Sequence, residues 1–124
     1  MQVEAFDHVN IRTRDVGAAA SFYSEILGLE VRNGPAPFAS EQVRWLCDSS
    51  GRAIVHLFRF DTEAAPTGPI HHIAFKCTGK ARAIEWLTTK GVEFSMREDA
   101  SGPLTQINLR DLDGILIELA FSEV

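Results

Sequence analysis

Hydrophobic and polar positions alternate along several short stretches of this chain, and two longer stretches repeat apolar residues at helical spacing. Alternation with a period of two is typical of half-buried strands, and apolar residues every three to four positions are typical of amphipathic helices. In the first half the pattern predicts a helix over 16–27, between Asp15, a suitable N-cap, and Gly28, which suits a left-handed helix end. Strands are predicted over 6–13, 29–32, 42–47 and 53–60.

The second half repeats this order of elements. A strand is predicted over 70–77, a helix over 80–90 with Gly91 as its stop, and strands over 92–96, 105–110 and 115–121. The stretch DTEAAPTGP between the halves has two prolines and one glycine, which is typical of a linker. We therefore predict a first βαβββ module over 1–62, a linker over 63–69 and a second module over 70–124, together forming one compact domain.

The two halves also match residue by residue. DHVNI at 7–11 aligns with HHIAF at 71–75, and LGLEV at 27–31 aligns with KGVEF at 90–94. SSGRAIVHLF at 49–58 corresponds to DLDGILIELA at 111–120, with a one-residue adjustment that we place in the turn. A repeat of this length indicates an internally duplicated fold. Neither copy alone buries much core, so the two must pack together or with copies from another chain.

Charge and composition exclude some partners. The net charge is −5, and the 12 lysines and arginines are scattered along the 124 residues, which argues against nucleic-acid binding. No apolar run approaches the length that spans a membrane, and the first residues, MQVEAFDH, are too polar for a signal peptide. The expectation is a cytoplasmic protein without a membrane partner.

Strand alternation separates a face that packs on the helix from an opposite face, here called the lining face. In the first strand Val9 and Ile11 are predicted to pack on the helix. Applied to the first and last strands of each module, the same rule places four ligand-type residues on the lining face at equivalent positions: His8, His56, His72 and Glu118. His71 takes the place of Asp7 and is predicted to be structural.

Glu118 interrupts the apolar run GILIELAF. A carboxylate in such a strand must be paired, protonated or bound to a metal, because an unpaired buried charge is costly. Three imidazoles and one carboxylate suit Zn, Fe(II), Ni or Co, and are compatible with Mn. A further set of side chains is predicted to line a substrate pocket: Asn10, Arg44, Phe58, Gln106 and Asn108.

The stretches FDHVNIRTRDVGAAASFYSEILGLEV, HHIAF and LRDLDGILIEL resemble the vicinal oxygen chelate superfamily over essentially the whole chain. This superfamily includes glyoxalase I, bleomycin- and fosfomycin-resistance proteins, methylmalonyl-CoA epimerase and extradiol dioxygenases. The resemblance implies an α+β fold, in which two βαβββ modules form a curled mixed sheet around a metal cleft with the helices outside. It also implies a homodimer in which His8 and His56 of one chain share a metal with His72 and Glu118 of the other.

The resemblance implies a metal-dependent enzyme of lyase, isomerase or epimerase type. Its divalent ion would chelate two adjacent oxygens of a small substrate and stabilise an enediolate, with Glu118 as the proton-transferring base and His56 as partner or substitute. Glyoxalase I enzymes typically have a carboxylate where this chain has His56. Two alternatives stay open: an Fe(II) extradiol-type dioxygenase, and a binding protein that shelters a small molecule without chemistry.

Overall fold

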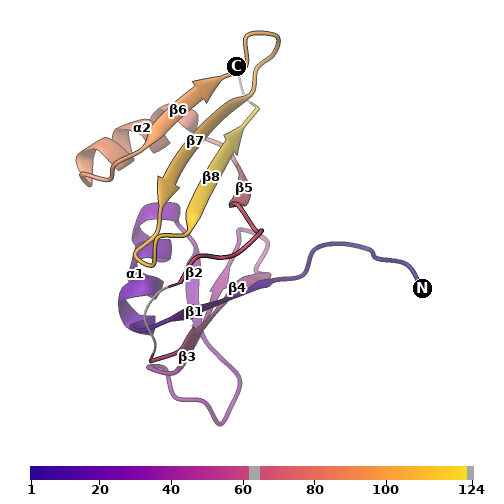
Figure 1. The fold of residues 1–124 in the computed structure, drawn as a ribbon, viewed down its shortest axis with the longest axis vertical. Coiled ribbons are helices and arrows are strands. Elements are labelled where there is room, and N and C mark those ends of the chain that lie inside the picture. Colours follow the sequence, from indigo (N-terminus) through magenta and orange to yellow (C-terminus); the bar gives the residue numbers. More distant parts are fainter. Residues whose placement is uncertain (62–64, 123–124) are drawn as a thin grey trace. The chain divides into compact units, whose positions relative to one another are not determined.

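The computed structural model describes residues 1–61 and 65–122. The chain divides into two compact units, here called unit 1 (Met1–Ala64) and unit 2 (Ala65–Val124). Residue 62 of the predicted first module, residues 63 and 64 of the predicted linker, and the last two residues of the predicted second module lie outside the described residues. Within the described residues each unit has one helix and four strands, the α+β arrangement that was predicted (Figure 1).

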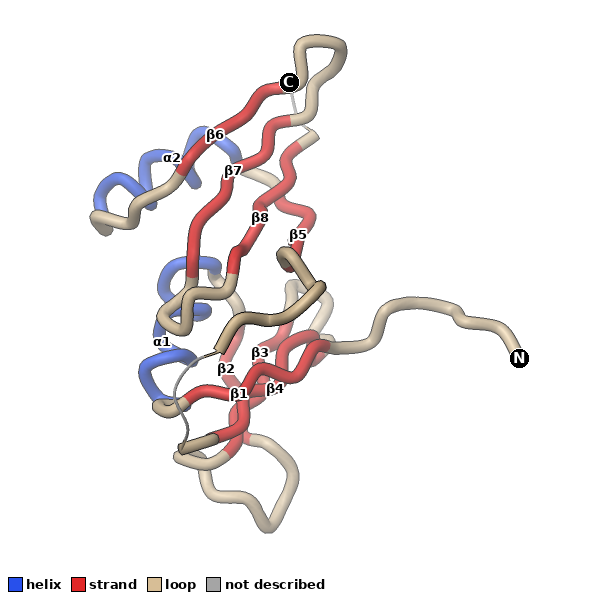
Figure 2. Tube along the Cα trace, in the orientation of Figure 1, coloured by secondary structure: helices blue, strands red, loops and turns tan. Residues whose placement is uncertain are grey.

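The two units have the same element order and the same sheet topology (Figure 2). Unit 1 consists of β1 (Val9–Thr13), α1 (Val16–Leu27), β2 (Glu30–Asn33), β3 (Val43–Cys47) and β4 (Ala53–Arg59). Unit 2 consists of β5 (Ile73–Cys77), α2 (Lys80–Thr89), β6 (Ser95–Glu98), β7 (Thr105–Arg110) and β8 (Leu116–Phe121). The strand orders are β1-β4-β3-β2 and β5-β8-β7-β6, with the first pair parallel and the other pairs antiparallel. The predicted pair of βαβββ modules is confirmed.

The ends of α1 follow directly from its sequence. The Asp15 side chain accepts a hydrogen bond from the Ala18 backbone N–H at 2.9 Å, which satisfies one of the free donors of the first turn. At the other end Gly28 has a φ of 74°, a left-handed conformation that costs glycine little. The predicted helix of residues 16–27 is therefore confirmed at both ends.

One face of each sheet is buried, and the alternation predicted for it is confirmed. In unit 1 Val55 and Leu57 of β4 are fully buried, and α1 packs against β2, β3 and β4. In unit 2 Ile117 of β8 is fully buried and Leu119 is 5% exposed. Burying one such side chain stabilises the fold by about 1.5–3 kcal/mol, so this face fixes the register of both central strands.

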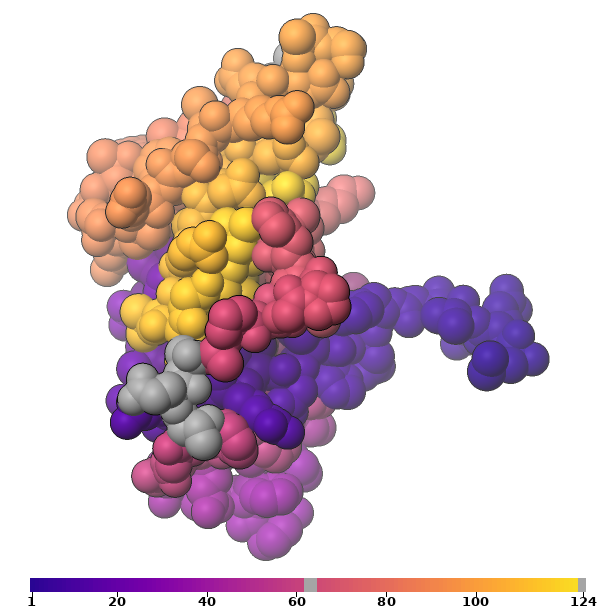
Figure 3. Space-filling model, viewed as in Figure 1, coloured from indigo at the N-terminus to yellow at the C-terminus, as the bar shows by residue number. Residues whose placement is uncertain are grey.

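The structure corrects three predicted strand starts. β1 begins at Val9 rather than residue 6, β5 at Ile73 rather than residue 70, and β6 at Ser95 rather than residue 92. The apolar side chains that suggested earlier starts, Phe6 and Ile70, are 76% and 63% exposed. Residues 1–6 are all exposed and extend away from the sheet of unit 1, as the indigo segment in Figure 3 shows. Their apolar content does not reflect burial in a strand.

The turn between β3 and β4 is organised by one carboxylate. Asp48 Oδ1 accepts hydrogen bonds from the backbone N–H groups of Ser50 and Arg52 at 2.9 and 3.1 Å, and from the Ser50 hydroxyl at 2.6 Å. Asp48 Oδ2 accepts two more from the Arg52 guanidinium. Gly51 closes the turn with a φ of 84°.

The turn between β7 and β8 repeats this arrangement. Asp111 Oδ1 accepts from the backbone N–H groups of Asp113 and Ile115, each at 2.9 Å, and Gly114 has a φ of 83°. Its backbone hydrogen bonds, from Asp111 to Ile115 and from Gly114 to Asp111, match those at Asp48. The two turns are therefore equivalent in their backbone hydrogen bonds and in the carboxylate that organises them.

The one-residue difference between the halves lies after the turn, not in it as predicted from the alignment. Cys47 of β3 pairs with Ala53 of β4, whereas the next residue back, Leu46, pairs with Val55. Ile54 is therefore an extra residue in a β-bulge. The bulge absorbs the extra residue, so the alternation of β4 beyond it matches that of β8.

No helix in residues 1–61 and 65–122 is long and apolar enough to cross a membrane.

The Asp48 turn makes unit 1 sensitive to acid. The hydrogen bonds from the Ser50 hydroxyl, the Ser50 and Arg52 backbone and the Arg52 side chain lower the pKa of Asp48 to about 2, from an ordinary value of 3.8. A carboxyl with a lowered pKa in the folded state adds stability above its ordinary pKa and loses it as the pH falls through the lowered value. Asp48→Ala should therefore lower the melting temperature at pH 7 and lower it less at pH 2, measured by circular dichroism. Asp61→Ala, which removes an exposed partner of Arg59, is the control; an equal loss for Asp48→Ala at both pH values would contradict this account.

Candidate functional site

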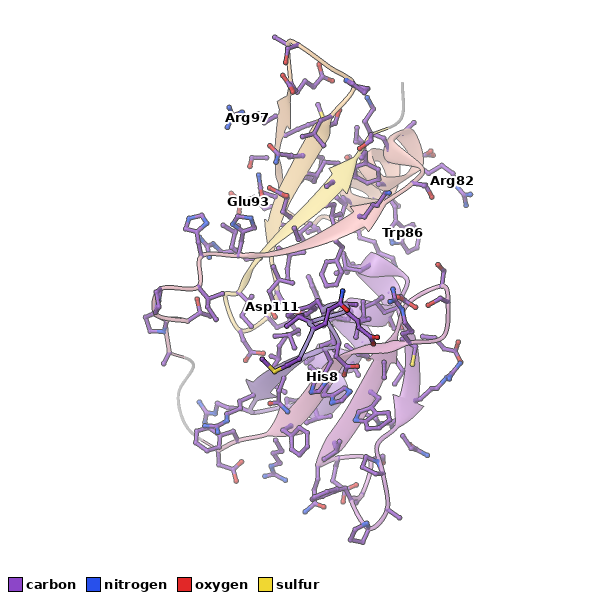
Figure 4. All side chains as sticks on the ribbon, turned by 90° about the vertical axis from the view of Figure 1, so that its right-hand side faces the viewer. His8, Arg82, Trp86, Glu93, Arg97 and Asp111 are labelled. Carbon is purple, nitrogen blue, oxygen red and sulfur yellow. The ribbon has the colours of Figure 1, made fainter. Side chains whose placement is uncertain are left out.

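In unit 1 the structure brings His8 and His56 into direct contact. His8 lies immediately before β1, where Figure 4 labels it, and His56 lies in β4. The two imidazole rings stack, with centroids 3.9 Å apart and planes inclined by 15°. Because β1 and β4 are neighbouring parallel strands, the predicted pairing of these two residues is present within one unit.

Trp45 extends this stack on the same face. It lies directly opposite His56 in the β3–β4 ladder, and the two rings are 4.6 Å apart at 11°. Stacked aromatic pairs of this kind contribute about 0.5–1.5 kcal/mol beyond the area they bury. Trp45 therefore restricts the orientation of the His56 ring.

Burial and a neighbouring histidine both act on His56. Burial lowers the pKa of the His56 imidazole, and the charge of His8 lowers it further, whereas the Ala53 backbone and Asp7 raise it by smaller amounts. A lowered pKa favours the neutral ring at neutral pH. Neutral imidazole is the form that binds metals and accepts protons.

Asp7 is hydrogen-bonded to the adjacent His8, with Asp7 Oδ2 2.5 Å from His8 Nδ1. The hydrogen bond and charge of His8 lower the pKa of the Asp7 carboxyl. An ionised carboxylate only accepts hydrogen bonds, so the proton between the two residues belongs to His8 Nδ1. This leaves Nε2 as the nitrogen of a neutral His8 that has a free lone pair.

In unit 2 the structure brings His72 and Glu118 together. His72 lies immediately before β5, and its Nε2 is 3.9 Å from Oε1 of Glu118 in β8. Gln106 Nε2 donates a hydrogen bond to the same oxygen at 3.0 Å. The Glu118 side chain is only 15% exposed, so the carboxylate that was predicted to need a partner has one in the Gln106 amide.

His71 contacts His72 rather than standing apart from the site. The two Nδ1 atoms are 2.9 Å apart, and the rings meet edge to face. One of these nitrogens must donate and the other accept. His71 was predicted to be structural. The structure places it in hydrogen-bond contact with His72, a candidate ligand.

The predicted pocket residues other than Arg44 lie on the lining face of their own unit. Asn10 pairs with His56 across the parallel β1–β4 ladder, and Asn108 pairs with Glu118 across β7–β8. Phe58 lies two residues after His56 on the same strand and packs edge to face against Phe38 at 5.9 Å.

Arg44 does not lie on this face, which corrects its predicted place. It pairs with the buried Leu57, one position out of phase with the Trp45–His56 pair, so its side chain points to the opposite side of the sheet. There its Nε donates to the Ser40 carbonyl at 3.1 Å, beside a cavity near the start of α1. A regular ladder continued from the Cys47–Ala53 pair would place Arg44 opposite His56, but the extra residue Ile54 in β4 shifts the register by one, so that Trp45 lies there instead.

A cavity of about 570 Å³ adjoins the unit 1 pair. Residues 2–7 line one part of it. The remaining lining residues come from β3, from β4 and from the turn between them: Trp45, Arg52, Ala53 and His56.

The donor types in both pairs fit a divalent metal ion, and each pair needs a small adjustment. Donors that bind one ion at about 2.0–2.1 Å lie about 3 Å or slightly more apart, so a modest rotation would bring His72 and Glu118 onto a common ion. The rings of His8 and His56 are nearly parallel, so their lone pairs do not point to a common ion. One ring would have to rotate out of the stack for both to bind it. Within 1–61 and 65–122, no group of three or more ligand-type residues is placed to hold a metal. Each unit thus supplies two of the four predicted ligands, and their convergence stays a prediction.

Sequence reasoning missed Trp45, Asp7 and His71 as neighbours of the candidate ligand histidines. Trp45 was missed because the bulge in the neighbouring strand β4 moves it, rather than Arg44, to the position opposite His56. Asp7 and His71 were placed on the opposite strand face by the alternation rule, but both strands begin later than expected. The sequence feature that could have indicated these neighbours is the pair of adjacent polar residues that recurs at 7–8 and 71–72.

The sequence profile of a family described as the Glyoxalase/Bleomycin resistance protein/Dioxygenase superfamily matches residues 5–119. No curated protein sequence matches the chain.

Solved structures share the fold at low sequence identity. A glyoxalase/dioxygenase from Nostoc punctiforme is similar with a TM-score of 0.79 and 20% identity, over 97% of this chain and 92% of that one. A genomically encoded fosfomycin resistance protein from Listeria monocytogenes gives 0.74 and 19%, over 99% and 97%. A lactoylglutathione lyase from Agrobacterium tumefaciens gives 0.69 and 20%, over 98% and 96%. These similarities establish the fold.

The stack predicts how His56 titrates in a tryptophan variant. Removing the indole with Trp45→Ala exposes the His56 ring, so its pKa should rise toward the ordinary value, as measured by NMR titration of its ring protons. Trp45→Phe keeps an aromatic ring at this position and should therefore raise the pKa of His56 less. Trp86→Ala, which removes the exposed tryptophan of α2, should leave the His56 pKa unchanged. An unchanged His56 pKa in Trp45→Ala would show that the indole does not bury this ring.

Proposed function

The chain belongs to the Glyoxalase/Bleomycin resistance protein/Dioxygenase superfamily, and on that premise we propose that it is a metal-dependent enzyme of lyase, isomerase or epimerase type. Its substrate is a small molecule with two adjacent oxygens. Its metal ligands are His8, His56, His72 and Glu118, of which two come from unit 1 and two from unit 2.

The observation that carries this proposal is the repetition of a two-residue ligand pair in both units. Each pair joins the residue immediately before the first strand to a residue in the central strand, and the two residues are in contact or within 3.9 Å. A single histidine near a strand is commonly structural. Two equivalent pairs on the lining faces of a duplicated fold are better explained by a shared ligand role.

A divalent ion held by this set would polarise the adjacent oxygens of the substrate as a Lewis acid. Within the protein, Glu118 is assigned the transfer of a proton from the carbon next to the substrate carbonyl. Its Oε1 accepts the hydrogen bond from Gln106, so we assign proton transfer to Oε2. Gln106 orients the carboxylate, which keeps the receiving atom in place between turnovers.

His56 is the second assigned acid–base group. Burial and the charge of His8 lower its pKa, which keeps the ring able to accept a proton at neutral pH. Around His56 the lining face carries two aromatic side chains, Trp45 of β3 and Phe58 of β4, and the amide of Asn10 on β1. These walls suit a compact, partly apolar substrate rather than a polymer.

We further propose a homodimer in which unit 1 of one chain and unit 2 of the other supply the two ligand pairs. Each unit carries half of the donor set, so a complete site requires one unit of each kind. Closed two-fold assembly would then generate two identical sites.

The first test is metal content and turnover. Protein purified without a histidine tag should bind one equivalent of Zn, Fe(II), Ni, Co or Mn per chain, measured by elemental analysis. Glu118→Gln should lower kcat by about 10²–10⁴-fold, the contribution typical of a positioned acid–base group. Compounds to screen are α-hydroxy-carbonyl compounds, lactoylglutathione and fosfomycin, the last two because structurally similar proteins are a lactoylglutathione lyase and a fosfomycin resistance protein.

Glu85→Gln, an exposed position on α2, is the matched control and should keep full activity. Turnover by metal-free protein would refute the mechanism. Oxygen consumption with Fe(II) and catechols would instead support the dioxygenase alternative. Tight binding of a small molecule that survives substitution of His8 and His72 would support a sheltering protein without chemistry.

A complementation experiment tests the shared site. The double variant His8→Ala/His56→Ala loses the unit 1 pair, and His72→Ala/Glu118→Gln loses the unit 2 pair. If sites form across chains, mixing the two inactive proteins under exchange conditions should restore about a quarter of wild-type activity, because half of the dimers are mixed and each has one intact site. Sites built within single chains would leave every mixture inactive.

A further inference from the structure

The residue before each candidate ligand histidine contacts the same atom of that histidine. Asp7 Oδ2 is 2.5 Å from His8 Nδ1, and His71 Nδ1 is 2.9 Å from His72 Nδ1. The two contacts occur at equivalent places in the two units, ahead of β1 and β5. The chemical types differ, since one partner is a carboxylate and the other an imidazole, but the atom that they hold is the same.

The late start of both strands makes these contacts possible. Within a strand, adjacent side chains point to opposite faces and cannot meet. β1 begins at Val9 and β5 at Ile73, so the backbone at 7–8 and 71–72 lies outside the ladders and is free of this alternation. A longer strand in either unit would separate each neighbour from its histidine.

Holding Nδ1 decides which nitrogen of the ring is available. A neutral imidazole has one N–H and one lone pair. A partner that accepts from Nδ1–H leaves the lone pair on Nε2, and metal-bound histidines usually donate their second N–H to such a partner. In unit 2 it is His72 Nε2 that faces the Glu118 carboxylate, at 3.9 Å.

His71 can accept this hydrogen bond only when its own proton is on Nε2. Its Nδ1 then carries the lone pair that receives the His72 proton. With His72 as the donor, the two adjacent histidines have different roles, His72 as the candidate ligand and His71 as its acceptor.

We propose that Asp7 and His71 are positioning residues that hold Nδ1–H of His8 and His72, so that each ring presents the lone pair of Nε2 to a metal ion. This inference rests on the proposed function, because it assigns the purpose of the arrangement to metal binding. Neither residue is a ligand itself.

The first experiment reads the tautomers in the absence of metal. Long-range ¹H–¹⁵N NMR of the full chain, at a pH above the histidine titration, should show His8 and His72 as Nδ1–H tautomers in the wild type. Asp7→Ala should convert His8 to a mixture of tautomers, and His71→Ala should do the same to His72. His71→Asp places the unit 1 residue in unit 2 and should restore the His72 tautomer. Unchanged tautomers in both alanine variants would overturn the proposal.

The second experiment measures the affinity for Zn²⁺ alone by calorimetry. Asp7→Ala and His71→Ala should each weaken binding by about 10- to 100-fold, as is typical when the hydrogen-bond partner of a ligand histidine is lost. His71→Asp should recover most of this loss. Asp61→Ala and Arg82→Ala, at exposed positions in unit 1 and unit 2, are the controls and should bind like the wild type.

The two experiments separate this inference from the function on which it rests. Expected tautomers in a wild type that binds no Zn²⁺ would refute the metal function while confirming the hold on Nδ1. Normal Zn²⁺ binding that is unaffected by Asp7→Ala and His71→Ala would refute the positioning role while leaving the metal function intact. Asp7 is 92% exposed on its side chain and His71 is exposed, so both variants should fold.

Discussion

The site depends on the register of the two central strands. β4 lies between β1 and β3, and β8 lies between β5 and β7, so each central strand is fixed by a ladder on both sides. Val55 and Ile117 are fully buried on one face, and a slip of one residue would expose such side chains and turn the opposite face inward. His56 and Glu118 occupy the lining face because their immediate neighbours must be buried.

The β-bulge shows how strictly this register is maintained. Unit 1 has one more residue than unit 2 between the end of the turn and its candidate ligand, yet the turns at Asp48 and Asp111 keep the same hydrogen bonds. The bulge at Ile54 takes up the difference within β4. Beyond it His56 lies opposite Trp45 as Glu118 lies opposite Asn108. The positions that the proposed chemistry uses are thus kept equivalent although the chain between them has changed in length.

The two candidate ligand pairs have different surroundings, and this fits different roles. The unit 1 pair is a stack of aromatic rings in which burial lowers the pKa of His56. The unit 2 pair contains a carboxylate oriented by the Gln106 amide. A neutral nitrogen donor and an oriented carboxylate are complementary as metal ligands and as proton acceptors. The two units have the same fold, but the residues at equivalent positions differ. The proposed site therefore has two chemically distinct halves.

The sequence alone determined the duplication, the order of elements, the caps of α1 and the four candidate ligands, because these depend on local periodicity, on turn chemistry and on residue type. It did not determine where β1 and β5 begin, the face of Arg44, or the contacts of Asp7, Trp45 and His71. Those depend on which backbone groups find a ladder partner and on a bulge opposite Cys47, which only the folded sheet decides. An apolar residue such as Phe6 has the same character whether it is paired in a strand or left in solvent, so its sequence context could not distinguish the two.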